Sequence, residues 1–85
     1  MENMVEKIMK ELETRMNASE NKCIFVTLKS NGREVQISEE TNLWTGQIFY
    51  DVNYVTRNDA EYVIEAIHVG TGDTLTQVAE WLSIR

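Results

Sequence analysis

The chain contains a single cysteine, Cys23, and a single histidine, His68, among its 85 residues. One cysteine cannot close an internal disulfide, and one cysteine with one histidine cannot supply the three or four protein ligands of a zinc site. The fold must therefore rest on one hydrophobic core, for which 42% of the residues are apolar. A chain of this length buries only about 60 to 65% of its unfolded surface. We expect one small domain over residues 1–85, with no metal and no cofactor.

Carboxylates are concentrated after residue 30. Residues 1–30 hold five acids and five bases, whereas residues 31–85 hold nine acids and three bases, so the second part carries the whole net charge of −6. A field of that sign repels phosphate backbones and anionic lipid surfaces, which argues against direct nucleic-acid binding and membrane docking. No apolar run approaches the length of a membrane span. We expect a cytoplasmic protein whose acidic part is either a solvated coat or a contact surface for a basic partner.

Apolar residues recur at helical spacing near the start of the chain. Met4, Ile8, Leu12 and Met16 form one stripe, which predicts an amphipathic helix over residues 2–17. A stripe rich in methionine suits a core or a pliable partner-binding groove. In so small a chain, the core interpretation is favoured.

A β-hairpin is predicted around Asn31 and Gly32. The residues before this pair are β-branched or apolar, and an Asn-Gly pair supplies the positive φ angles of a two-residue turn. With this turn, Leu28 would lie opposite Val35, and Lys29 opposite Glu34. Residues 47–56 then alternate between apolar and polar side chains, which predicts a third, antiparallel strand with the rings of Tyr50 and Tyr54 toward the core.

The period changes after residue 58. Ala60, Val63, Ile64 and Ile67 have helical spacing, and Asn58 is placed to cap such a helix, so we predict a helix over residues 59–69. A fourth strand is the alternative, because several of these residues are β-branched. A last helix follows from the stripe over residues 75–82, capped by Asp73 or Thr74 together with Gln77.

These patterns predict an α+β fold. It would contain an N-terminal helix, a three-stranded antiparallel sheet and two C-terminal helices. The sequence contains no linker or repeat that would divide the chain.

The chain offers little for catalysis. A nucleophile needs an oriented base, and Cys23 with His68 is the one thiol and imidazole pair available. Cys23 lies in an apolar strand, where a cysteine is usually a small buried side chain. His68 suits the C-terminus of the predicted helix, where its charge would meet the helix dipole. We therefore expect no enzyme activity.

The loop over residues 39–46 holds the most distinctive surface feature. Leu43 and Trp44 lie among polar residues after Glu39 and Glu40, which is typical of an interface anchor. The loop could equally fold back over the sheet. The candidate partner-binding residues are Glu34, Glu39, Glu40, Leu43, Trp44, Asp51, Asp59, Glu61, Glu65 and Asp73.

The charge pattern favours a protein-binding module that occupies a basic surface of another protein. Where that surface receives nucleic acid, as in a nucleic-acid-processing enzyme, the acids would take the place of phosphates and the chain would act as an inhibitor. Compact acidic phage proteins that block CRISPR nucleases are similar in size, charge and element order, although no residue motif supports this resemblance. The alternative is an assembly subunit that forms a homodimer through its first helix or a strand edge.

Overall fold

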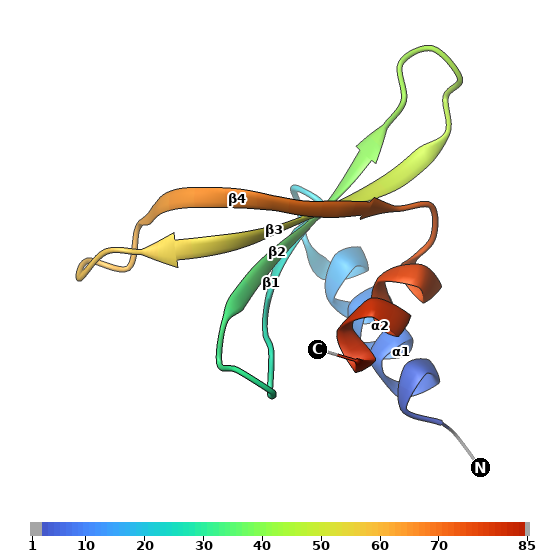
Figure 1. Cartoon of the computed structure of the whole chain (residues 1–85). Helices are drawn as coiled ribbons and strands as arrows, with labels where there is room; N and C mark the ends of the chain where they lie inside the picture. Colours follow the sequence, from blue (N-terminus) through green and yellow to red (C-terminus); the bar gives the residue numbers. More distant parts are fainter. Residues whose placement is uncertain (1–2, 85) are drawn as a thin grey trace.

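The computed structural model describes residues 3–84, which form two helices and a four-stranded sheet (Figure 1). The elements are α1 (Met4–Ala18), β1 (Cys23–Thr27), β2 (Glu34–Thr41), β3 (Ile48–Arg57), β4 (Val63–Gly72) and α2 (Leu75–Ser83). The strands lie in the order β1-β2-β3-β4, and every neighbouring pair is antiparallel. The α+β class is confirmed.

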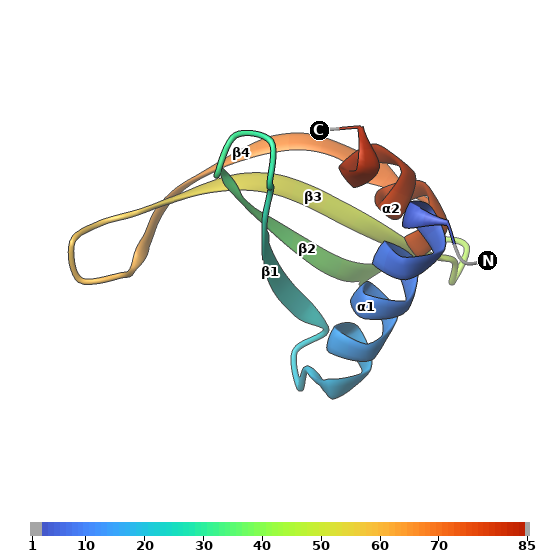
Figure 2. The ribbon, with the colours of Figure 1, turned by 90° about the horizontal axis from the view of Figure 1, so that it is seen from below.

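Both helices cover the same face of the sheet, and the core lies between them and the strands (Figure 2). The buried core cluster consists of Leu12, Met16, Ile24, Leu28, Val35, Ile37, Val52, Val78, Ala79 and Leu82. The opposite face of the sheet, called here the open face, has no helix on it (Figure 2). Among the described residues, neither helix is long and apolar enough to cross a membrane.

The first and last helices form where the sequence predicts them. The Asn3 side chain accepts a hydrogen bond from the Glu6 N–H at 2.8 Å and so caps α1. Residue 2, which the predicted helix included, lies outside the described residues. Thr74 caps α2 by accepting from the Gln77 N–H, and the Gln77 side chain accepts in turn from the Asp73 N–H at 2.7 Å. Thr74 and Gln77 thus form the predicted cap, except that the Gln77 side chain bonds to the N–H of Asp73, one residue before the N-cap, rather than to that of Thr74.

The predicted helix over residues 59–69 is wrong, and the chain has one C-terminal helix rather than two. These residues form a tight turn and then β4, which pairs with β3 from Tyr50 to Arg57. Asn58 does cap the following backbone, but its Oδ1 accepts from the Ala60 and Tyr62 N–H groups and closes a turn. Gly70, just after the predicted helix, pairs with Val52 inside the sheet.

The first hairpin forms, but its predicted register is wrong by two residues. Val35 pairs with Val26 rather than Leu28, and Glu34 pairs with Thr27 rather than Lys29. Residues 29–32 form a four-residue loop, closed by the Leu28 N–H donating to the Arg33 carbonyl at 2.7 Å. Only Gly32 of the predicted turn pair takes a positive φ, of 70°. The Asn31 side chain accepts a hydrogen bond from the Arg33 N–H within this loop. A two-residue shift preserves the faces, so the predicted core residues remain on the core side.

The third strand is confirmed over nearly its predicted range, as β3. Val52 is buried, and the rings of Tyr50 and Tyr54 pack against the core as predicted. The Tyr54 ring also lies 6.3 Å from that of Trp81 on α2 and beneath the Arg33 guanidinium. The two tyrosines therefore extend the core toward both helices.

The turn between β3 and β4 contains a strained residue, Glu61, which has a φ of 67°. This left-handed conformation costs a residue with a Cβ about 1 kcal/mol relative to glycine. We expect Glu61→Gly to raise the free energy of unfolding by about 1 kcal/mol in urea titrations. Glu61→Ala is the control, because it removes the charge and keeps the Cβ. Equal stability of the two variants would contradict the strain argument.

Candidate partner-binding surfaces

The loop between β2 and β3 projects away from the sheet and from both helices (Figure 1). Residues 43–46 form a four-residue loop like that of the first hairpin, closed by the Asn42 N–H donating to the Gln47 carbonyl at 2.8 Å. The Asn42 side chain accepts from the Trp44 and Thr45 N–H groups, and Gly46 takes a φ of 74°. The loop conformation is therefore held by its own backbone and side-chain hydrogen bonds.

The two apolar side chains of this loop are almost fully exposed. Leu43 is 94% and Trp44 is 97% exposed. Of the two alternatives left open by the sequence, the folded-back loop is therefore wrong. Side chains of this size are seldom left in water without a contact to make, and a tryptophan on a projecting loop has the form of an interface anchor. We call Leu43 and Trp44 the loop anchor.

Glu39 and Glu40 lie at the base of this projection, within β2 rather than in the loop. They point to opposite faces of the sheet, because neighbouring strand residues alternate. Glu39 lies across from Tyr50 on the helix side. Burial of the Tyr50 hydroxyl, with the charge and hydrogen bond of Glu39, raises the Tyr50 pKa above its usual value. Glu40 is exposed on the open face beside Phe49, so it is the member of the pair available to a partner.

Glu34 is neutralised by Arg57 on the open face. The Arg57 Nε and Nη2 atoms donate to the two carboxylate oxygens of Glu34 at 2.6 and 3.0 Å. The same guanidinium lies over the Phe25 ring and donates to the Glu61 carbonyl. Its hydrogen bonds lower the pKa of Glu34 below the ordinary value of 4.5. Glu34 is therefore a structural acid rather than an unopposed charge.

This ion pair predicts how stability depends on pH. Because the folded-state pKa of Glu34 is lowered, its contribution is complete above pH 4.5 and is lost as pH falls through the folded value. We expect Glu34→Gln to be less stable than wild type at pH 7, and the difference to shrink below pH 4.5. Urea midpoints measured at several pH values check this. A difference that stays constant with pH would contradict it.

Asp51 and His68 form a second polar pair on the open face. His68 Nε2 lies 2.9 Å from Asp51 Oδ1, and Asn53 donates to the other carboxylate oxygen. The predicted position of His68 at a helix C-terminus is wrong, because this residue lies in β4. Cys23 lies in β1 with two strands between it and β4, and its Sγ accepts from Gln36 Nε2. In the described part of the chain, no three His, Cys, Asp or Glu side chains are placed to hold a metal.

The far end of the β3–β4 hairpin combines acids with exposed apolar side chains. Asp59 and Glu61 lie in its turn, and Glu65 follows on β4. Tyr62, which the sequence offered as an extension of the surface patch, is 71% exposed. Sequence reasoning missed three aliphatic surface residues that follow it, because a helix would have buried one side of them: Val63, Ile64 and Ile67 are 40, 63 and 51% exposed. The β-branched run at 63–64 was the signal that pointed to the alternative, a strand.

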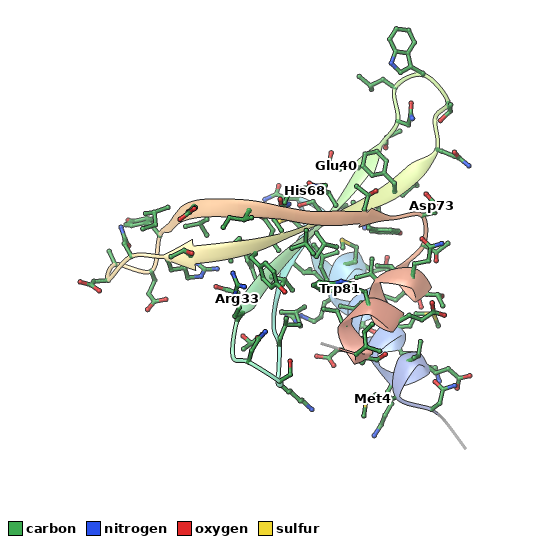
Figure 3. The ribbon with its side chains drawn as sticks, viewed as in Figure 1. Met4, Arg33, Glu40, His68, Asp73 and Trp81 are labelled. Carbon is green, nitrogen blue, oxygen red and sulfur yellow. The ribbon has the colours of Figure 1, made fainter. Side chains whose placement is uncertain are left out.

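Asp73 lies apart from the other acids, where β4 leads into α2, whereas Glu40 and His68 lie on the open face (Figure 3). It forms one wall of a shallow, open hollow of about 370 Å³ between α1, β3 and α2. Glu13 and Tyr50 also line this hollow. The ten residues selected from the sequence therefore lie at several places: the loop anchor and its base, the open face, the β3–β4 turn and this hollow.

No family model, curated protein or solved structure matches the chain. Any function must therefore be argued from the geometry of these surfaces.

Proposed function

We propose that this chain is a small acidic protein-binding module that occupies a basic surface of another protein. The observation that carries the proposal is the loop anchor, with Trp44 97% exposed on a projecting loop of defined conformation. A preformed loop loses little conformational entropy on binding, and a buried indole contributes strongly to affinity. The loop anchor would supply the apolar contact of the interface.

The charge of the second part of the chain supports a basic partner. Between residues 31 and 84 the two bases are both engaged, Arg33 over the Tyr54 ring and Arg57 with Glu34. Within the described residues, no base forms an ion pair with Glu40, Asp59, Glu61, Glu65 or Asp73. Such a field speeds encounter with a positive surface. Where the partner is a nucleic-acid-processing enzyme, occupation of its nucleic-acid site would inhibit it by charge mimicry, with no catalytic step.

A homo-oligomeric assembly subunit is the second candidate. The exposed apolar side chains of β4 favour it, because an unpaired strand edge is a common site of self-association. Native mass spectrometry separates the two candidates. A protein-binding module should be a monomer by itself and should form a complex with one basic protein. An assembly subunit should be a homodimer that salt does not dissociate.

Affinity capture from host lysate tests the basic-partner proposal. We expect one basic protein to be retained at low ionic strength and released by about 0.5 M salt, because screening weakens charge attraction. The charge variant is Glu40→Lys with Glu65→Lys. Its matched control is Glu13→Lys with Glu20→Lys on the neutral first part, and each double variant changes the net charge from −6 to −2. Capture lost in the first and kept in the second supports the proposal, and equal capture by both would contradict it.

A further inference from the structure

The two edges of the sheet differ in how much of their backbone is already bonded. At β1, the Cys23 N–H donates to the Ser19 hydroxyl at 3.2 Å, and this hydroxyl donates back to the Cys23 carbonyl at 3.0 Å. The Arg15 side chain donates to the Phe25 carbonyl of the same edge. Groups that could pair with another strand are therefore occupied by side chains from α1 and the segment after it.

The β4 edge has no comparable cover among residues 3–84. This strand pairs only with β3, and residues 63–68 are all exposed. The hydrogen bonds of β3 show which backbone groups of β4 point outward. Successive residues along β3 bond to opposite neighbouring strands. Gln47, just before β3, bonds toward β2, and Asn58, just after it, bonds toward β4. Val55 and Asn53 share the parity of Gln47 and pair with Ala66 and His68. The N–H and C=O groups of Ala66 and His68 therefore point away from the sheet.

Acids flank this open edge along its length. Asp59 and Glu61 lie at one end, Glu65 within the strand and Asp73 at the other end. A second copy pairing antiparallel to β4 would bring Asp59 and Glu61 of each copy beside Asp73 of the other, where like charges repel. An extended segment rich in lysine or arginine would meet opposite charges at these points, while its apolar side chains contact Ile64 and Ile67.

We infer that β4 binds an extended basic segment of the partner protein as a fifth strand of the sheet. Backbone hydrogen bonds to Ala66 and His68 hold the segment, and the flanking acids select a basic sequence over a neutral or acidic one. The inference rests on the proposed function, since it names the part of the basic partner that β4 receives. It also gives the exposed apolar side chains of β4 a role distinct from the loop anchor.

A peptide titration tests the inference without an identified partner. The probe is a peptide as long as β4 in which lysine and valine alternate, and its control has glutamate at each lysine position. NMR hydrogen exchange is measured on wild-type protein. At nine-tenths saturation with the lysine peptide, exchange of the Ala66 and His68 amides is expected to slow about tenfold, because only the free tenth exchanges. The glutamate peptide is expected to change nothing.

Other results overturn the inference. Shifts confined to residues other than those of β4, or equal protection by both peptides, would exclude a basic fifth strand. Slow exchange of the same amides in the protein alone, with the mass of a dimer, would mean that a second copy occupies the edge.

Variants separate this inference from the proposed function. Ala66→Pro removes the outward N–H and should prevent protection by the peptide, whereas Ala66→Val keeps it and should not; unchanged α1 resonances verify the fold. In partner capture, loss with Trp44→Ala but not with Ala66→Pro leaves the proposed function standing and overturns the fifth strand. Loss with neither variant contradicts both.

Discussion

Replacing Trp44 by alanine is expected to weaken partner binding by about 30- to 1000-fold and to leave folding stability nearly unchanged. Truncation of a central aromatic anchor typically removes about 2 to 4 kcal/mol of binding free energy, and each 1.4 kcal/mol is a factor of ten. The Trp44 side chain is 97% exposed, so its loss removes no core contact, and the free energy of unfolding should change by less than about 0.5 kcal/mol. Calorimetric titration against the captured partner and urea unfolding measure the two quantities.

The second tryptophan provides the matched control for this prediction. Trp81 packs against the core near Tyr54, so Trp81→Ala should destabilise the fold by about 3 kcal/mol. Its folded fraction should still bind the partner with nearly wild-type affinity. Wild-type affinity in Trp44→Ala would show that the loop anchor lies outside the interface.

Replacing Ile37 by alanine is expected to lower the free energy of unfolding by about 2 to 5 kcal/mol. Ile37 is 0% exposed and lies on the helix side of the sheet, in the core cluster beneath the helices. Removal of its side chain leaves a cavity in a domain whose total stability is about 5 to 15 kcal/mol. The melting temperature should fall by about 8 °C or more, since 1 kcal/mol corresponds to about 4 to 8 °C at this size.

The matched control is Ile64→Ala, in the same sheet. Ile64 is 63% exposed, so its replacement should cost less than about 1 kcal/mol, mostly through lower strand propensity. Similar losses in the two variants would contradict the assignment of the core to the helix side.

The parts of the fold predicted correctly are those with one regular period. The stripe of α1 and the alternation of β3 each fit a single element, and local capping residues fixed where both helices begin. Asn3 was not predicted as a cap. Thr74 with Gln77 was, because a threonine three residues before a glutamine can accept a hydrogen bond from the glutamine backbone N–H.

β4 was predicted as a helix because bulges interrupt its alternation. Two irregularities in the pairing with β3 leave Ile64 and Val69 as extra residues. The extra residue at 64 breaks the two-residue alternation of the strand, so the apolar residues at 63, 64 and 67 match the spacing of a helix instead. Pairing with a long, regular β3 then outweighs the local preference, which a single sequence cannot show.

The candidate site could be predicted only in part. Leu43 and Trp44 were singled out from the sequence, but the choice between an exposed and a folded-back loop was left open, because their exposure depends on how far β2 and β3 extend beyond the helices. The number of acidic residues after residue 30 can be read from the sequence. Which of them are neutralised depends on basic side chains that lie far away in the sequence. Arg57 reaches Glu34 only because β3 pairs with β2.

Photocrosslinking from position 44 tests the central claim most directly. A benzoylphenylalanine replaces Trp44 in one variant and Thr14, exposed on α1, in the other. After irradiation in host cells, we expect a single covalent adduct with one basic protein from position 44 and none from position 14. No adduct from position 44, or the same adduct from both positions, would contradict binding through the projecting loop.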